Sequence, residues 1–470
     1  MVTRSRPKRL QSAADAAVRE VAPGGLLDRR HFLRGGLGVA LLAPLPVGVL
    51  AATGAGSEAS LVADNPSVVT GPDGHGAVAR PDAQSALAST RTPGTPFSNY
   101  GSPSRYESEV IRWISDNPAA PGNGISWTPL HALEGTLTPN GLHFERHHNG
   151  VPDIDPAKHR LRFEGLVEQA LEFSLDDLLR YPMQSVQCVI ECGGNSNAGW
   201  NKRPIQAPVG YFHGLVSASE WVGVPVRHLL AEAGNLKSAR WVVAEGADAI
   251  EHHMSIPIAR ILDSALIGLY QNGERLRPEN GYPMRLIVPG CEGVLHVKWL
   301  RRMTLTDRPV MSRNETARYT ELLPSGKARA FTFVMQPKSI ITSPSCGMTL
   351  PERGFYEIKG LAWSGRGRIR KVEVSADGGR NWAEAALDTP VQPRAFTRFR
   401  IPWRWNGQRA TLVSRATDET GETQPTRREL VAARGRNGYF HYNAQVSYAV
   451  LEDGYLEHVY LEDDAEDRAW

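Results

Sequence analysis

The chain has 470 residues, and its 53 Lys and Arg against 50 Asp and Glu leave a formal net charge of +3. That balance gives no electrostatic case for a nucleic-acid partner. Four cysteines are too few for a disulfide-dense fold. A chain of this length is typical of about three domains and allows a large hydrophobic core.

The N-terminal segment, residues 1–55, is predicted to be an export signal. Arg29 and Arg30 precede an uncharged, Gly-rich run over residues 35–57. A twin arginine before a weakly apolar stretch is typical of Tat-type signals. The run is long enough to span a bilayer, so a transmembrane anchor is the alternative, but its prolines and glycines favour export. We therefore expect a periplasmic protein that is free of the membrane after export.

Residues 56–105 are rich in Ser, Gly, Pro, Thr and Ala without a hydrophobic period, which predicts a flexible arm. Residues 106–332 are predicted to fold as an α+β domain. Two helices are expected there, "FSLDDLLRYP" with Ser174 as its N-cap and "WVGVPVRHLLAEAG" closed by Gly234. The segments "MRLIVPG" and "HVKWLRRMTL" are typical of buried strands.

Residues 333–445 show the pattern of short strands separated by turns. The segment "IRKVEVSADGGRNWAEAAL" predicts a hairpin. A following strand places four apolar side chains on one face: Phe399, Ile401, Trp403 and Trp405. This spacing of strands favours an immunoglobulin-like β-sandwich. The acidic end, residues 446–470, is predicted to be a solvated tail, with docking of a partner as the alternative.

Two of the four cysteines lie four residues apart in "VQCVIEC". In a strand, Cys188 and Cys192 would lie about 13 Å apart. A disulfide needs Cα atoms within about 7 Å, so the pair is neither a disulfide nor two ligands of one metal ion. Cys188 is in mid-strand, whereas Cys192 opens into a Gly-rich loop. One of them is therefore core; from spacing alone, Cys192 is either a second core residue or a functional thiolate.

The chain resembles a known family in four segments that occur in order: "IECGGN", "GLVSASEWVGVPVRHLL", "NGYPMRLIVPGCEGVLHVKWL" and "AWSGRGRIRKVEVSADGGRNW". Together they resemble the sulfite oxidase family of molybdenum enzymes over about residues 125–445. The resemblance implies a molybdopterin-binding domain followed by an immunoglobulin-like domain through which the chain forms a homodimer. Two further segments, "TPNGLHFERHHNGVPDIDPAKHRL" and "RNETARYTELLPSGKARAFTFVM", carry a narrower likeness to the SoxC group, the molybdenum subunits of sulfane dehydrogenases.

The resemblance also assigns site residues. Cys192 in "CGGN" matches the cysteine that ligates molybdenum beside molybdopterin, which leaves Cys188 structural. Three residues match the substrate pocket: Arg146, Tyr319 and Arg436. Five match contacts to the pterin and its phosphate: His148, Asp248, Arg285, His296 and Lys298. Taken singly, each has a structural alternative: Arg285 could be a charge at a sheet edge, and Tyr319 a core aromatic.

Departures from the animal sulfite oxidases bear on the substrate. Ser196 and Asn197 stand where those enzymes have two arginines, and Asn280 stands in place of a histidine. Fewer fixed cations suit free sulfite less well, so we expect sulfane sulfur carried on a protein cysteine as the substrate. No CxxCH haem site and no GxGxxG fingerprint occur in the sequence, so electrons must leave to another protein. The resemblance implies a c-type cytochrome subunit in an assembly with two copies of each.

Three other functions stay open. The first is sulfite dehydrogenase, within the same class. The second is a periplasmic zinc hydrolase that uses the histidines of "HFERHH" and the run Glu251, His252 and His253. The third is a non-catalytic binding protein made of a β-sandwich fused to an α+β domain.

Overall fold

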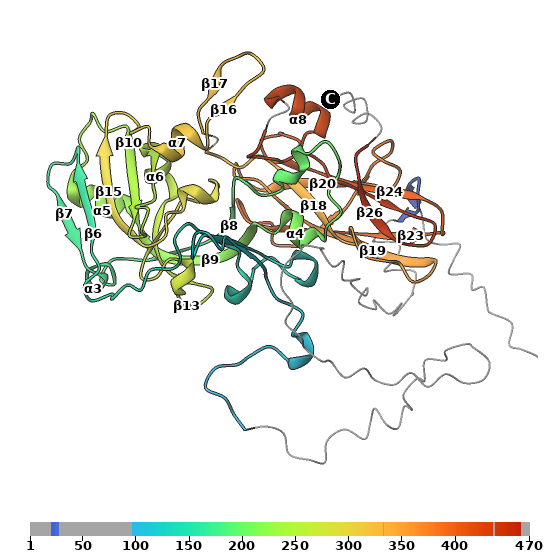
Figure 1. Cartoon of the computed structure of the whole chain (residues 1–470), viewed down its shortest axis with the longest axis horizontal. Helices are drawn as coiled ribbons and strands as arrows, with labels where there is room; N and C mark the ends of the chain where they lie inside the picture. Colours follow the sequence, from blue (N-terminus) through green and yellow to red (C-terminus); the bar gives the residue numbers. More distant parts are fainter. Residues whose placement is uncertain (1–19, 28–95, 332, 436–437, 462–470) are drawn as a thin grey trace, which may run out of the picture. The chain divides into compact units, whose positions relative to one another are not determined.

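A computed structural model describes residues 20–27, 96–331, 333–435 and 438–461 (Figure 1). Packing of the chain separates residues 50–109 from a large unit that holds residues 1–49 and 110–470. In the described part of the smaller unit, the 3-10 helix η2 (Arg105–Glu107) follows Ser104. The uncharged run of the predicted export signal lies outside the described residues. Within these ranges no helix has the length and apolar character needed to cross a membrane.

The first half of the large unit contains three sheets, which Figure 1 shows in cyan to yellow. A three-stranded sheet comprises β3 (Trp113–Asp116), β4 (Gly124–Trp127) and β5 (Glu145–His147). A five-stranded sheet has the order β11 (His253–Pro257), β10 (Trp241–Gly246), β15 (Leu300–Thr306), β6 (Leu161–Gly165) and β7 (Leu171–Phe173). The third has the order β13 (Glu274–Arg275), β12 (Leu266–Gln271), β9 (Val216–Pro225) and β8 (Gln184–Glu191), and β14 (Arg285–Ile287) also pairs with β12.

Helices pack against the five-stranded sheet of β6 and β15, and one of them begins, and another ends, where the sequence predicts. Helix α3 (Leu175–Leu178) begins after Ser174, whose hydroxyl accepts from Asp177 N in a capping box. Helix α5 (Val226–Ala233) ends at Gly234, which has a φ of 67°. Helices α5 and α6 (Ile258–Ser264) bury their apolar faces in one cluster with the strands of this sheet. The two predicted helix ends are therefore confirmed.

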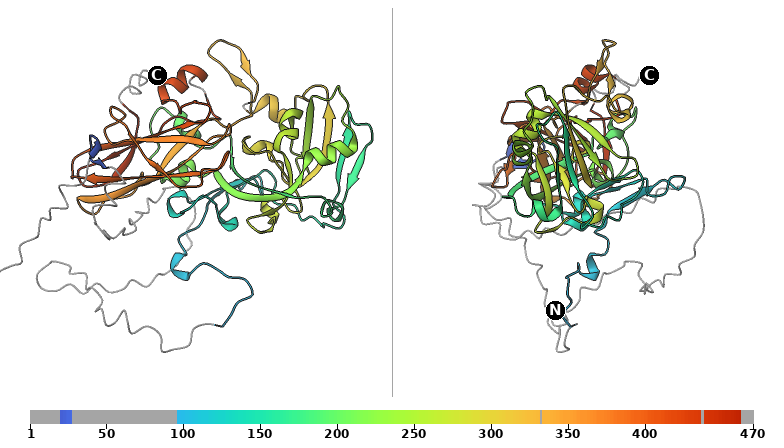
Figure 2. Two further views of the ribbon diagram at one scale, coloured as in Figure 1. Left: turned by 180° about the vertical axis from the view of Figure 1, so that it is seen from behind. Right: turned by 90° about the vertical axis from the view of Figure 1, so that its left-hand side faces the viewer.

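The second half is an immunoglobulin-like β-sandwich, as predicted, and Figure 2 shows its two sheets in orange and red. One sheet contains β1 (Glu20–Ala22), β2 (Leu26–Leu27), β18 (Lys338–Ser343), β19 (Gly354–Trp363), β22 (Ala386–Leu387) and β23 (Thr397–Trp405). The other contains β20 (Ile369–Ser375), β21 (Ala383–Glu384), β24 (Ala410–Asp418), β25 (Ser447–Val450) and β26 (Leu456–Val459). The predicted apolar face of β23 lies in the core between them.

Short elements connect these layers. They are the helices α4 (Val209–His213), α7 (Arg313–Ala317) and α8 (Arg427–Arg434), the hairpin of β16 (Glu321–Leu322) and β17 (Ala328–Arg329), and several 3-10 helices. Those 3-10 helices are η3 (Leu130–Ala132), η4 (Asn140–Leu142), η5 (Asn197–Trp200), η6 (Pro278–Asn280) and η7 (Gly293–Leu295).

The predicted acidic tail, residues 446–470, is wrong over its first part. Strands β25 and β26 complete one sheet of the sandwich, and Tyr448, Val450 and Leu456 are buried. The side chains of β26 alternate between buried and partly exposed positions, and its one carboxylate, Glu457, is at a partly exposed position. The prediction was based on the high acid content of this segment and overlooked the alternation of buried and exposed side chains.

The two halves share part of their hydrophobic core and are also joined by a buried ion pair. One apolar cluster combines Val189 of β8 with Trp363 of β19. Lys338 at the start of β18 places its Nζ 2.8 Å from Oε1 of Glu191 at the end of β8, and the Lys338 side chain is 1% exposed. The predicted boundary near residue 332 therefore separates two sequence segments, but the hydrophobic core continues from one segment into the other.

Breaking this pair should destabilise the whole unit. We expect Lys338→Met to lower the free energy of unfolding by about 3–5 kcal/mol, because it leaves the Glu191 carboxylate buried without its counter-charge. Urea titration measures the change. Lys158→Met is the matched control, since Lys158 and Asp155 are 3.5 Å apart with 86% and 48% of their side chains exposed, and should change stability by less than about 1 kcal/mol. Equal effects of the two variants would contradict the expectation.

Candidate active site

One cavity gathers most of the residues that the resemblance selected. It encloses about 780 Å³ of non-protein space, part of it open to solvent. Eight of the predicted site residues line it: Arg146, His148, Cys192, Asp248, Arg285, His296, Lys298 and Tyr319. They come from five separate segments between Arg146 and Tyr319, so it is folding that brings them together. The ninth, Arg436, lies outside the described residues.

Cys192 lies where β8 ends and the Gly-rich loop begins. Its backbone N–H donates to the carbonyl of Leu215 over 2.9 Å, and its carbonyl accepts from Asn195 N over 2.8 Å. Burial raises the pKa of the Cys192 thiol to about 11, so a cationic ligand such as a metal is needed to hold the thiolate form at neutral pH. Cys188 is fully buried in mid-strand, and both thiols are free. The structure thus agrees that the pair forms no disulfide.

The glycine after Cys192 makes room for the wall of the cavity. A Cβ at Gly193 would lie 2.7 Å from Oε2 of Glu292 and 3.5 Å from the rings of Tyr319 and Phe440. Any side chain at Gly193 would therefore push these groups away from Cys192. Close approach, rather than an unusual φ, explains the glycine here.

Two cations lie in the cavity wall without an acidic partner. The Arg285 guanidinium donates to the carbonyls of His296 and Asn280, over 3.1 and 3.2 Å. Lys298 Nζ donates to the carbonyls of Arg146 and Glu279, over 3.2 and 3.1 Å. Among the described residues no carboxylate lies within ion-pair distance of either.

Desolvation lowers the pKa of both cations. The pKa of Arg285 falls to about 10, and burial together with the neighbouring Arg285 holds the pKa of Lys298 well below its usual value. Two charged groups held together in this way favour an anion between them. A phosphate is such an anion, and it accepts charge-assisted hydrogen bonds from both side chains.

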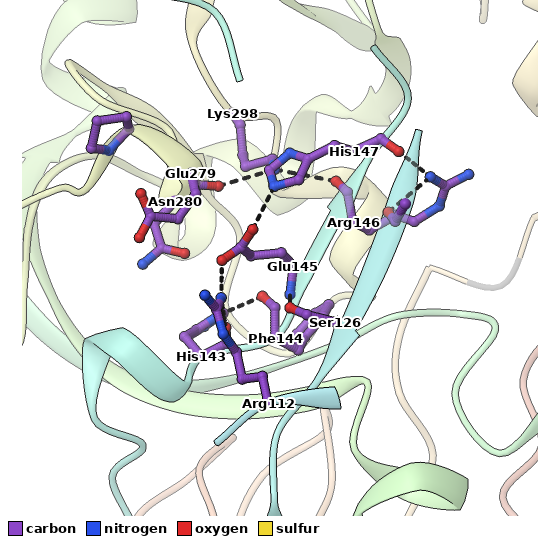
Figure 3. A network of polar contacts seen from close by, with 12 residues as sticks. Arg112, Ser126, His143, Phe144, Glu145, Arg146, His147, Glu279, Asn280 and Lys298 are labelled. Carbon is purple, nitrogen blue, oxygen red and sulfur yellow. Dashed lines mark hydrogen bonds and ion pairs between the residues drawn. The ribbon is translucent and has the colours of Figure 1, made fainter. Parts of the chain in front are cut away.

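A polar chain behind the cavity positions Lys298 (Figure 3). Lys298 Nζ donates to His147 Nδ1 over 2.8 Å, and His147 Nε2 donates to Glu145 Oε2 over 2.8 Å. Arg112 closes the chain through an ion pair with the other oxygen of Glu145. Burial, with Lys298 next to it, lowers the pKa of His147 to about 3. His147 is therefore a neutral bridge that holds the ammonium group.

Arg146 and Tyr319 lie on the side of the cavity nearer Cys192. Arg146 donates to Asn123 Oδ1 over 2.8 Å, and its Nη2 lies 3.2 Å from His148 Nδ1. Among the described residues it has no carboxylate partner, so its charge is available to an anionic ligand. The Tyr319 ring packs on Phe331 and Phe440, and in the described ranges its hydroxyl makes no hydrogen bond to protein. Tyr319 therefore does not fit the alternative of a core aromatic with a satisfied hydroxyl.

Two other predicted residues hold the wall through the backbone. His296 accepts from Val288 N at Nδ1 and donates to the Cys291 carbonyl from Nε2, at 3.3 and 3.1 Å. Asp248 accepts from the backbone N–H of His252 over 2.8 Å. Both residues line the cavity, so contact with a ligand and support of the loop are compatible roles. The strand expected over "HVKWLRRMTL" starts only at Leu300, because His296 to Trp299 form this wall.

A buried acid and histidine beside Cys192 were not anticipated from the sequence. Glu292 pairs with His441 through Oε1 and Nδ1, and its Oε2 has no partner among the described residues. Burial, with Glu191 nearby, raises the pKa of Glu292 well above its usual value. Glu292 and His441 are separated by 149 positions in the chain. No spacing or motif signals that two such distant residues meet.

The departures noted in the sequence have different structural meanings. Asn280 lines the cavity. Ser196 does not, because its hydroxyl lies 2.6 Å from His213 Nδ1 and accepts from Lys338 over 2.8 Å in the junction between the two halves. Only Asn280 therefore bears directly on the charge of the cavity.

The residues proposed for zinc do not converge. Among the described residues no group of three His, Cys, Asp or Glu side chains is placed to hold a metal ion. His252 stacks near His148, with ring centroids 6.3 Å apart, and His253 bonds to the carbonyl of Glu251. This arrangement gives the zinc hydrolase hypothesis no site.

Comparison with known proteins shows which class of protein this chain resembles. The family model "Oxidoreductase molybdopterin binding domain" matches residues 148–314, and "Mo-co oxidoreductase dimerisation domain" matches 329–448. The mitochondrial sulfite oxidase of Mus musculus is 34% identical, over 63% of this chain and 59% of that protein. The sulfite oxidase of Gallus gallus is 31% identical, over 67% of this chain and 75% of that protein. The match thus spans less than two thirds of the mouse enzyme.

A solved structure agrees over a greater length. The sulfane dehydrogenase SoxCD from Paracoccus pantotrophus matches with a TM-score of 0.76 and 43% identity, over 80% of this chain and 97% of that chain. Fold and cavity define a molybdopterin-binding oxidoreductase with a dimerisation domain. The chain belongs to the sulfite oxidase family, and its cofactor is molybdenum with molybdopterin, as the sequence predicted.

The residues present fit this cofactor. Thiolate sulfur is a soft ligand that suits molybdenum, and Cys192 presents the one cysteine of the cavity lining. Arg285 and Lys298 supply the unpaired cations that a pterin phosphate requires. The roles of Cys192 as the metal ligand and of these two cations as phosphate contacts stay predictions, and the geometry is compatible with both.

Replacing the two cysteines should separate metal binding from stability. We expect Cys192→Ser to abolish molybdenum retention and activity while the fold persists. Cys188→Ser should retain about one molybdenum per chain but lose about 1–3 kcal/mol of stability, since its hydroxyl is buried among apolar groups. Metal analysis and thermal unfolding of both variants measure this. Retention of molybdenum by Cys192→Ser would refute the assignment.

Buried histidines should make the fold sensitive to acid. His143 lies outside the cavity lining, and burial, with Arg285 nearby, lowers its pKa to about 3. The unfolded chain binds this proton near pH 6.5, so stability is lost as pH falls from about 6.5 towards 3. In His143→Asn the slope of unfolding free energy against pH over this window should fall by up to about 1.4 kcal/mol per pH unit. An unchanged slope would show that His143 does not contribute.

Proposed function

We propose that this protein oxidises sulfane sulfur carried on the cysteine of a carrier protein and passes the electrons to a c-type cytochrome subunit. The observation that carries the proposal is the match to a sulfane dehydrogenase over 97% of that chain at 43% identity. The match includes both the cavity and the dimerisation domain. Similarity to sulfite oxidases is lower and supports sulfite dehydrogenase as the alternative.

The charge and shape of the cavity near Cys192 support this substrate. On this side Arg146 lies close to Tyr319 and to the exposed Arg318. Tyr319 packs on Phe440, and the buried pair of Glu292 and His441 lines an adjoining cavity together with Cys192. Burial raises the pKa of Glu292 well above its usual value, which favours its neutral form, so this acid adds little negative charge beside Cys192. Among the described residues Arg146 is the one cation that lines this side of the cavity, and one cation matches a singly charged persulfide better than a doubly charged free anion.

Each side chain has a role that follows from its position. Arg146 presents N–H donors to the anionic end of the substrate. Tyr319 is a neutral donor that orients an oxygen in the cavity, because its hydroxyl has no protein partner among the described residues. The bound cofactor supplies oxygen-atom transfer and accepts an electron pair for each oxygen. Water provides that oxygen, so two protons are released with each pair.

Electron transfer requires another protein. The sequence contains no CxxCH haem site, and its four cysteines include no cluster for iron–sulfur. A c-type cytochrome subunit would accept the electrons, in an assembly of two copies of each chain. The match to a Mo-co dimerisation domain over residues 329–448 supports pairing of two copies through the β-sandwich. Arg29 and Arg30, with the uncharged run that follows, support export to the periplasm.

The substrate test compares two donors under one set of conditions. With a c-type cytochrome as acceptor, kcat/KM for a carrier-protein persulfide should exceed that for free sulfite by at least about tenfold, which is about 1.4 kcal/mol of transition-state binding. Arg146→Gln should lower kcat/KM for the persulfide, whereas Arg313→Gln, an exposed arginine of α7, should not. Efficient turnover of free sulfite together with inactivity on the persulfide would reject sulfane specificity and favour sulfite dehydrogenase.

A further inference from the structure

A short hairpin from the N-terminal region is part of the β-sandwich. Strands β1 and β2 pair with each other, and Leu26 of β2 pairs with Trp403 of β23. Figures 1 and 2 show the hairpin in blue beside the red strands. Residues 20–27 lie inside the predicted export signal, directly before its twin arginine. Nothing in the sequence had suggested that this segment has structure of its own.

The hairpin contacts the sandwich in the way that an additional strand contacts the edge of a sheet. The Trp403 indole N–H donates to the Gly24 carbonyl over 2.7 Å. The backbone N–H of Arg404 donates to the Gly25 carbonyl, also over 2.7 Å. Ala22 and Leu26 enter the sandwich core, and Leu26 is 0% exposed. Main-chain bonds with alternate buried side chains are the mode by which extended peptides bind a sheet edge.

The glycine pair in the turn makes the fit specific. Gly24 and Gly25 have φ of +91° and +90°, a region that disfavours other residues. A Cβ at Gly25 would lie 2.1 Å from the Arg404 carbonyl, and one at Gly24 would lie 3.0 Å from Cβ of Ala376. Few other turn sequences would meet both requirements. The sandwich edge thus recognises this segment of the chain itself.

The position of the hairpin has a consequence for the twin arginine. Arg29 and Arg30 are two and three residues beyond Leu27, the end of β2. Both arginines lie outside the described residues, whereas Leu26 and Leu27, which precede them, are buried in the sandwich. A receptor whose binding footprint extends from the twin arginine back to Leu26 or Leu27 must first remove these side chains from the sandwich. Docking of the hairpin and receptor binding therefore compete.

We propose that residues 20–27 dock on β23 of the folded sandwich as an autoinhibitory contact, which withholds the twin arginine from the export machinery. The sandwich is formed by the end of the chain, so docking reports that the last domain has folded. Release of the hairpin then permits export, and a retained precursor has time to load its cofactor. This inference rests on the proposed export by the Tat route.

Trypsin cleavage of the full-length precursor tests the contact directly. Cleavage after Arg29 and Arg30, normalised to cleavage after Arg91, should rise at least about tenfold in Leu26→Asp, because an aspartate cannot enter the core position that Leu26 fills. Val21→Asp is the matched control, since Val21 lies in the same hairpin but is 41% exposed. Gly25→Ala should act like Leu26→Asp, because its Cβ meets the Arg404 carbonyl. Equal cleavage rates in wild type, Leu26→Asp and Gly25→Ala would overturn the proposal.

Export in a bacterial host with a Tat system provides the second measurement. In a pulse-chase experiment Leu26→Asp should be exported at least about twofold faster than wild type and Val21→Asp, and its exported pool should contain less molybdenum per chain. Export of Leu26→Asp at the wild-type rate would reject the autoinhibitory role even if cleavage by trypsin rises. Absence of any Tat-dependent export of wild type would instead refute the export proposal, and trypsin would still report whether the hairpin docks.

Discussion

The buried pair of Glu191 and Lys338 is the contact on which the site depends. Glu191 accepts from Lys338 and from Asn195 Nδ2 at Oε1, over 2.8 and 2.9 Å, and from the Trp363 indole at Oε2 over 2.8 Å. One carboxylate thus joins both halves of the unit to the loop that directly follows it. Because Cys192 is the next residue, any shift of the sandwich relative to β8 would move the thiol. The β-sandwich is therefore part of the support of the active site.

The cofactor cavity holds cations that lose hydration without gaining a counter-charge, and an anionic ligand would offset that loss of free energy. Arg146, Arg285 and Lys298 face it without carboxylate partners in the described part of the chain, and desolvation lowers the pKa of each. The neutral His147 and the ion pair behind it fix one of these cations but do not neutralise it. An anionic cofactor would add its binding energy to the stability of the fold, since it binds the native state alone.

Local patterns predicted local structure well here. The Ser174 cap, the Gly234 end of α5 and the single apolar face of β23 each depend on a few neighbouring residues, and each is found. The cavity lining could be named only through the resemblance, because its members come from distant segments. Glu292 with His441, and the hairpin of residues 20–27, depend on tertiary pairing, which leaves no periodic trace in the sequence. Composition misled at residues 446–461, where the buried strand β25 and the half-buried strand β26 complete a sheet.

The same reasoning reinterprets the residue that stands in place of an arginine. Ser196 has a φ of 62° and is buried, and its hydroxyl contacts both Lys338 and His213. An arginine at this position would place a second cation beside Lys338 with only Glu191 to balance the two. The serine and the lysine are thus mutually required at the junction. The serine at this position therefore concerns how the sandwich is attached, whereas Asn280 is the departure that lines the cavity and bears on its charge.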